Sequence, residues 1–160
     1  MAVFKKSSGC TPTGIMRHLN AGRVIFLVVT DKDRSRLRIE SYMFEPSERM
    51  RSGKALAAWW AYSKDTVPDD DNFMASMCYA KDLDTWLSLA EKYGRHCVPG
   101  IEDTYQKHFE WYLNGEGGHF FNDLKKINAG YELFYTDETD GFCKGIEEEF
   151  ARYYFGKYVK

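Results

Sequence analysis

One uninterrupted apolar segment limits the folds that are open to this chain of 160 residues. Residues 24–29 read Val-Ile-Phe-Leu-Val-Val and lie between Arg23 and Thr30. β-branched and aromatic residues favour strands, and a strand that is apolar at every position needs cover on both of its faces. The segment therefore predicts a strand near the centre of a sheet.

The neighbouring elements are predicted from capping residues and apolar periodicity. Thr11 with Pro12 marks a helix start, and Asn20-Ala21-Gly22 marks its end. Leu37, Ile39 and Tyr42 alternate with charged residues as a half-buried antiparallel partner strand that ends at Pro46. Further strands are expected at 2–5, 73–80 and 131–136, and a turn is expected at 137–141. Ser47 or Ser52 can cap a helix at 55–62, and another helix is expected from Asp82 or Asp84 to Gly94. The remaining helices are expected at 101–113, 120–127 and 146–155.

These elements predict an α+β fold, with mixed α/β as the alternative. A central antiparallel or mixed sheet is expected to pack against several helices. The length suits a single globular domain, residues 1–160. Residues 19–26 and 127–134 share Asn-Ala-Gly followed by a strand with Phe at the same offset, which we interpret as two similar αβ corners rather than a repeat fold.

Charge is divided unevenly along the chain. Residues 1–60 hold 11 Lys and Arg against 5 Asp and Glu, and residues 61–160 hold 11 against 19. Arg34, Arg36 and Arg38 would share one side of an extended strand, where they could meet phosphates or an acidic protein. Carboxylates interleave with them and the pI is about 6.1, so a protein partner is favoured over nucleic acid. The two portions could also neutralise each other across an internal seam.

Aromatic residues outnumber the branched aliphatic ones. Phe, Tyr and Trp total 26, against 23 for Leu, Ile and Val. Trp59 and Trp60 are adjacent in the predicted helix at 55–62, and Trp111 lies off the apolar face of another predicted helix. Two interpretations stay open for these tryptophans: a broad buried helix face, or an aromatic anchor for a partner protein.

Small residues follow Pro46 where the predicted helix begins. At such a junction backbone N–H groups can approach a pyrophosphate, and the helix N-terminus adds positive potential. The stretch resembles the acyl-CoA-binding turn of the GNAT acetyltransferases: Gly53 and Ala55 match, while Met50 stands where that family has Gln or Arg. The resemblance implies an N-acyltransferase that holds acetyl-CoA through Ser52, Gly53, Lys54 and Ala55.

The cysteines and histidines complete no metal site. Cys10, Cys78, Cys97 and Cys143 are far apart and show no CxxC pair, so free thiols in a reducing compartment are expected. The histidines show no zinc-ligand spacing, and Cys10 with His18 lacks an orienting third group for nucleophilic catalysis. No apolar run approaches the ~20 residues of a spanning helix, so no membrane association is expected.

We therefore expect a small cytoplasmic protein that binds a partner protein, as an inhibitor, immunity or accessory factor of microbial or phage type. The alternatives are a GNAT-like N-acyltransferase and a nucleic-acid-binding protein. The sequence sets neither the partner's identity nor the oligomeric state. The candidate partner-binding residues are Arg34, Arg36, Arg38, Arg51, Trp59, Trp60 and Trp111.

Overall fold

The computed structural model describes residues 2–30, 37–48, 51, 53–60, 82–93, 95–101, 130–142 and 144–159. The helices within these ranges are α1 (Pro12–Asn20), α3 (Leu83–Tyr93) and α6 (Ile146–Tyr158). The strands are β1 (Lys5–Lys6), β2 (Val24–Thr30), β3 (Leu37–Pro46), β4 (Lys54–Trp60), β5 (Arg95–Ile101) and β6 (Gly130–Thr136). In this part of the chain no helix combines the length and apolar character that crossing a membrane requires.

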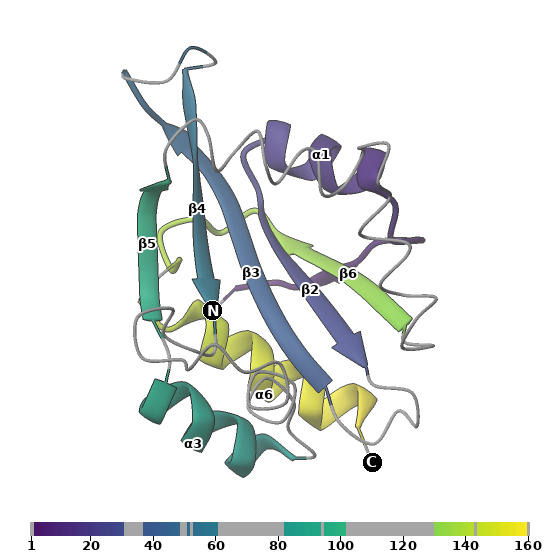
Figure 1. Cartoon of the computed structure of the whole chain (residues 1–160). Helices are drawn as coiled ribbons and strands as arrows, with labels where there is room; N and C mark the ends of the chain where they lie inside the picture. The colour runs from purple at the N-terminus through teal and green to yellow at the C-terminus, as the bar shows by residue number, and fades with distance from the viewer. Residues whose placement is uncertain are drawn as a thin grey trace.

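The strands form one sheet in the order β1-β6-β2-β3-β4-β5 (Figure 1). Every neighbouring pair is antiparallel, so the α+β class is confirmed and the sheet is of the antiparallel kind. β2 pairs with β6 on one side and with β3 on the other, and residues 24–28 are buried. The predicted central strand is therefore confirmed.

Helices pack on both faces of this sheet. Val24, Phe26 and Val28 of β2 point into a cluster with α3 and α6, whereas Ile25 and Leu27 pack with α1 on the other face. Figure 1 shows α6 crossing the lower end of the strands and α1 near the upper end of β2. β3 is likewise buried on two faces, not one as predicted, because Ile39 belongs to the first cluster and Tyr42 to the second.

The predicted helix at 55–62 is wrong, because Lys54–Trp60 forms strand β4. β4 pairs with β3 so that Phe44 lies opposite Leu56 and Pro46 opposite Lys54. Between them the Ser47 N–H donates to the Gly53 carbonyl at 3.0 Å, and Gly53 has a positive φ of 72°. The helix preference of alanine and leucine yields to burial of residues 55–57 within the sheet.

Other predicted elements are confirmed. The Gly14 N–H donates to Thr11 Oγ1 at the start of α1, and the Thr85 N–H donates to Asp82 Oδ1 at the start of α3. β6 and α6 lie where strand and helix were expected, and the acidic first turn of α6 holds Glu147, Glu148 and Glu149.

The remaining differences concern the sheet edges. β1 covers residues 5–6 rather than 2–5, and β5, which contains Pro99, was not predicted. An edge position tolerates proline, which has no N–H to donate. Ile101, which was predicted to begin a helix, ends β5. The strand predicted at 73–80, the rest of the helix predicted at 101–113 and the helix predicted at 120–127 lie outside the described residues.

Candidate functional site

Three of the seven predicted partner-binding residues are beyond what the structure describes. Arg34, Arg36 and Trp111 lie outside the described residues. Arg38 is placed in β3, opposite Val29, and Trp59 and Trp60 are placed in β4 rather than in a helix. Arg51 is exposed beside the β3–β4 turn. Whether these seven residues lie together is therefore not tested by the described part of the chain, and their role stays a prediction.

The turn that resembles an acyl-CoA site lacks its helix. Ser52 is outside the described residues, Gly53 lies in a hairpin turn, and Lys54 and Ala55 begin β4. Lys54 Nζ donates to the Asn20 carbonyl at 3.1 Å, at the end of α1. Because a strand follows the turn, no helix N-terminus is presented to a pyrophosphate at this place.

Cys10 and His18 do not form a nucleophile and its base. Cys10 packs against the apolar cluster under α1, and burial raises its pKa to about 12, which favours the thiol over the reactive thiolate. His18 Nδ1 already accepts a hydrogen bond from Arg23. Within the described ranges, no group of three His, Cys, Asp or Glu side chains could hold a metal ion.

Two lysines of β1 occupy the sheet edge beside β6. Lys5 lies opposite Tyr135 and Lys6 opposite Phe134, so the two side chains project to opposite faces. Lys6 Nζ lies 2.9 Å from Glu132 Oε2, 5.9 Å from the Phe134 ring centroid and 5.5 Å from that of Tyr158. The short N-terminal strand is thereby tied to both β6 and α6.

The end of α6 adds a further cation next to this lysine. Lys157 Nζ lies 5.6 Å from the ring centroids of both Tyr153 and Tyr158. Tyr158 is exposed, with 36% of its surface accessible. Cations over aromatic faces are attracted to the rings, so lysines and tyrosines here form one connected surface.

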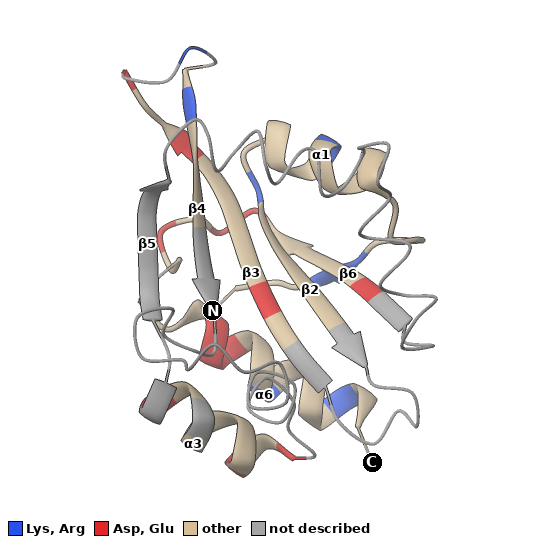
Figure 2. Ribbon diagram, in the orientation of Figure 1, with Lys and Arg blue, Asp and Glu red and all other residues tan. Residues whose placement is uncertain are grey.

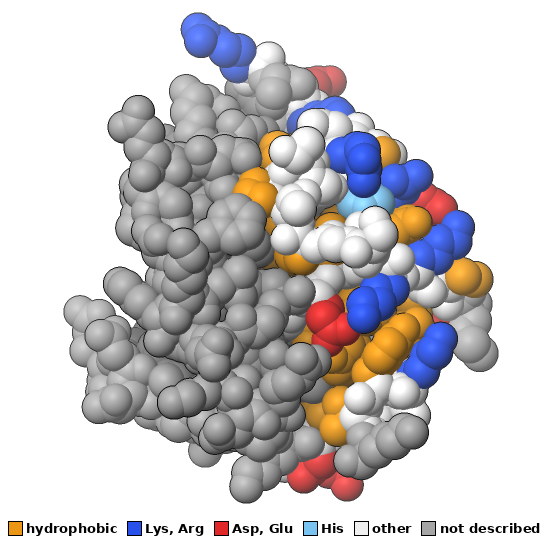
Figure 3. All heavy atoms as spheres, turned by 90° about the vertical axis from the view of Figure 1, so that its right-hand side faces the viewer, with side chains coloured by type: hydrophobic (Ala, Val, Ile, Leu, Met, Phe, Trp, Pro, Cys, Tyr) orange, Lys and Arg blue, Asp and Glu red, His pale blue; other side chains and the backbone are white. Residues whose placement is uncertain are grey.

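Basic residues gather along this side of the molecule. Figure 2 shows Lys and Arg on α1, at the start of β2, on β1 and near the end of α6, while acidic residues mark β3, β6 and the start of α6. Seen from that side in Figure 3, Lys and Arg side chains recur down the described part of the face, with apolar groups between them. We name this surface the basic edge and define it by Lys5, Lys6, Arg17, Arg23 and Lys157.

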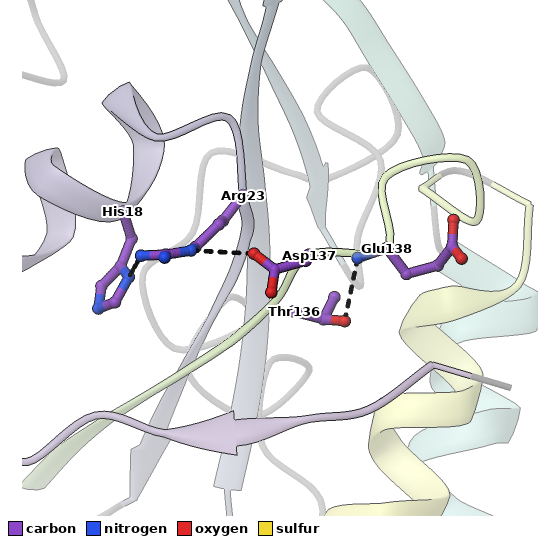
Figure 4. Close-up of polar contacts among 5 residues, drawn as sticks. All are labelled: His18, Arg23, Thr136, Asp137 and Glu138. Atoms are coloured by element: carbon purple, nitrogen blue, oxygen red, sulfur yellow. Dashed lines mark hydrogen bonds and ion pairs between the residues drawn. The ribbon is translucent and has the colours of Figure 1, made fainter.

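A chain of polar contacts crosses the upper part of the basic edge (Figure 4). Arg23 Nη1 donates to His18 Nδ1 at 3.0 Å, and Arg23 Nε donates to Asp137 Oδ1 at 3.0 Å. We name His18, Arg23 and Asp137 the Arg23 clasp. It joins α1, the residue before β2 and the turn after β6.

Local structure brings the three residues together. The pairing of β2 with β6 sets Val24 opposite Thr136, so Arg23 and Asp137 follow one step further along the same register. Gly22, with φ 79°, ends α1, and the Arg23 N–H donates to the His18 carbonyl at 3.2 Å. Thr136 Oγ1 accepts from the Glu138 N–H at 3.2 Å and fixes the turn that carries Asp137.

The Tyr135 ring packs against both His18 and Arg23 of the clasp. The His18 ring stacks on it at 4.2 Å between centroids and 23° between planes, and the Arg23 guanidinium carbon lies 5.1 Å from its centroid. The Arg23 side chain keeps 32% of its surface exposed. The guanidinium is therefore held in one orientation and still reaches solvent.

His18 is held neutral within this arrangement. Arginine only donates, so the contact with Arg23 requires an unprotonated Nδ1 and places the ring proton on Nε2. Burial lowers the pKa of His18, and the positive charges of Arg23 and Arg17 lower it further, while Asp137 opposes them. His18 is 5% exposed, and Nε2 has no hydrogen-bond partner among the described residues.

Sequence reasoning singled out His18 only as a base for Cys10 and did not single out Arg23 or Asp137. The one signal that could have found their pairing is the repeated Asn-Ala-Gly stretch. Its two phenylalanines, Phe26 and Phe134, lie directly opposite each other in the β2–β6 pair. A predicted pairing of Phe26 with Phe134 would have placed Arg23 next to Asp137.

No protein-family model matches the chain, and no curated protein or solved structure is significantly similar to it.

Proposed function

We propose that this chain acts by binding an acidic partner protein through the basic edge, as an inhibitor, immunity or accessory factor. The observation that carries the proposal is the edge itself, where Arg23 lies over the partly buried Tyr135 ring and Lys157 lies over the exposed Tyr158 ring. Arginine and tyrosine are enriched in protein interfaces and dominate their binding energy. A basic surface also steers an acidic protein toward it.

Carboxylates within the edge favour a protein over a nucleic acid. Glu132 binds Lys6, Asp137 binds Arg23, and Glu138 follows in the same turn. A phosphate backbone carries one negative charge after another and would meet each of these carboxylates. A folded acidic protein can place its few carboxylates where the edge is positive.

The edge strand favours a different protein over a second copy of this chain. β1 is two residues long, and both residues are lysines. Short edge strands and edge lysines oppose direct strand-to-strand pairing between identical sheets. Contact through side chains, with a partner of opposite charge, is the arrangement that this edge supports.

Two finer expectations belong to the same proposal. We propose a single domain, because α1, α3 and α6 pack on one continuous sheet. We also propose a cytoplasmic location, which the free thiol of Cys10 supports because thiols persist in reducing compartments.

Affinity capture with charge-reversed variants tests the proposal. The tagged protein is used as bait in a lysate of its own source, treated with nuclease, beside Lys5→Glu, Arg17→Glu and the matched control Lys144→Glu. Lys144 is exposed and lies outside the basic edge. We expect one stoichiometric acidic protein, retained by the control and reduced about fivefold or more by either edge variant.

Two results would contradict the proposal. One is a captured protein that all three variants retain equally, since the basic edge would then not be the binding surface. The other is capture that nuclease abolishes, which would point to nucleic acid.

A further inference from the structure

Arg23 differs from the other cations of the basic edge because two of its nitrogens are already fixed. Nε is held by Asp137 and Nη1 by His18, and the plane lies near the Tyr135 ring. A guanidinium carries five N–H donors, so these two contacts leave donors unused. No described residue accepts from Nη2.

The Arg23 side chain is partly exposed and has other cations near it. The Arg23 side chain is 32% exposed and that of Asp137 is 70% exposed, so a ligand can approach along the Asp137 side. Arg17 lies close enough to lower the pKa of His18, and Lys5 lies opposite Tyr135. The turn after β6 sets two carboxylates, Asp137 and Glu138, against the three cations Arg23, Arg17 and Lys5.

We infer that Arg23 is the anchor of the basic edge and takes a carboxylate side chain from an acidic segment of the partner protein. This inference rests on the proposed function. A planar guanidinium matches a carboxylate with two parallel hydrogen bonds, which a lysine cannot reproduce. Because His18, Asp137 and Tyr135 have already ordered the side chain, binding costs little further rotamer entropy.

The same chemistry could meet a phosphate, and the clasp favours the carboxylate. Asp137 Oδ1 lies 3.0 Å from Arg23 Nε and shares this guanidinium with any ligand. A phosphate of a nucleic acid brings more charge and further phosphates beside it, which Asp137 and Glu138 repel. A single carboxylate side chain can take the unused donors while Asp137 stays in place.

The first test uses a defined probe and the purified full chain. A fluorescent peptide of alternating glutamate and glycine is titrated against wild type and Arg23→Lys, with a glutamine peptide and a single-stranded oligonucleotide as comparisons. Arg152→Lys is the matched control, because Arg152 is an exposed arginine of α6 that pairs with Glu148 outside the basic edge. We expect Arg23→Lys to raise the dissociation constant of the glutamate peptide about tenfold. The control should change that constant by less than about twofold.

A second measurement needs no variant. The Nε–Hε resonance of Arg23, recorded on ¹⁵N-labelled wild type, is expected to shift on addition of the glutamate peptide and to stay in place with the glutamine peptide. An unmoved resonance, equal affinity of wild type and Arg23→Lys, or tighter Arg23-dependent binding of the oligonucleotide would each overturn the inference.

Partner capture separates failure of the anchor from failure of the proposed function. If Lys5→Glu and Arg17→Glu abolish capture but Arg23→Lys leaves it unchanged, the edge binds the partner without this anchor. If none of the three variants changes capture, the proposed function of the edge is wrong as well. Loss of capture in all three, with Arg152→Lys unaffected, is the result that we expect.

Discussion

At the scale of single residues, His18 makes the Arg23 clasp sensitive to pH. The contact with Arg23 exists only while Nδ1 is unprotonated, and the pKa of the folded histidine lies below its ordinary value of 6.5. The unfolded chain therefore binds more protons than the folded chain as pH falls below 6.5. The stability that the neutral histidine contributes is present above that pH and is lost as pH falls toward the folded pKa.

Urea unfolding checks this dependence. We expect the free energy of unfolding of the wild type to fall between about pH 7.5 and about pH 5.5. His18→Asn offers an amide oxygen in place of Nδ1 but does not titrate, so its free energy of unfolding should fall less over that interval. Parallel pH profiles of the two proteins would show that His18 is not the group responsible.

Asp137 competes with any carboxylate that approaches Arg23. It is 70% exposed, and exposed ion pairs contribute about 0–1 kcal/mol, so Asp137→Asn should change the free energy of unfolding by less than about 1 kcal/mol. The same change removes a negative charge beside the guanidinium, and we expect the glutamate peptide to bind about threefold more tightly. Asp140→Asn, an exposed aspartate of the same turn, is the control. Weaker peptide binding by Asp137→Asn would contradict the competition.

At the scale of elements, the sequence predicted the helices and strands whose local conformational preference matches the structure that their tertiary surroundings require. Thr11, Pro12 and Gly22 define α1, and the run at 24–29 defines a strand that is covered on both faces. β4 could not be predicted, because Ala55, Leu56 and Ala57 favour a helix locally and only their burial against β3 makes them a strand.

The site was less predictable than the fold for the same reason. His18, Arg23 and Asp137 come from three elements, and Asp137 lies 114 positions from Arg23. Only the register of β2 with β6 brings them together, and a register is a long-range property. The acyl-CoA interpretation used residues that are adjacent in sequence, but the helix that it needs after them is absent, because they continue into strand β4.

The β3–β4 turn gives a prediction about stability. Gly53 has φ 72°, and a side chain there costs about 1–2 kcal/mol, so Gly53→Ala should lower the free energy of unfolding by about that amount. Gly9 has no positive φ and nothing within 4 Å of an added Cβ, so Gly9→Ala should be close to neutral. Equal effects in urea unfolding would argue against the hairpin.

The same turn gives a prediction about ligand binding. A strand follows Gly53, so the turn offers no helix dipole to a pyrophosphate. We therefore expect millimolar acetyl-CoA to leave the melting temperature unchanged, measured by differential scanning fluorimetry with Gly53→Glu in parallel. A rise in the wild type that Gly53→Glu abolishes would restore the acyltransferase interpretation.

At the scale of the whole molecule, the uneven charge of the chain is partly neutralised across one seam. Lys6 pairs with Glu132 and Arg23 with Asp137, and in both pairs a cation from the basic portion meets an acid from the acidic portion. The seam is the β1–β6–β2 side of the sheet, and the Ala2 N–H also donates to Glu149 in α6. The basic edge is the part of that seam where cations exceed their partners.

Aromatic packing joins the same distant segments in the core. Phe150 of α6 is fully buried and stacks on Phe26 at 4.2 Å, with Phe4 and Phe134 each at 5.3 Å. We expect Phe150→Ala to lower the free energy of unfolding by about 3–5 kcal/mol. A loss of that size is a large share of the total stability of a small domain, about 5–15 kcal/mol.

Val3 supplies the control for this last change. Val3 is 68% exposed, so the free energy of unfolding of Val3→Ala should stay within about 0.5 kcal/mol of the wild-type value in the same urea titration. If the N-terminal segment, the sheet and α6 form one cooperative unit, tryptophan fluorescence and far-UV circular dichroism will report a single transition for both variants. Two separate transitions in Phe150→Ala would show instead that α6 unfolds apart from the sheet.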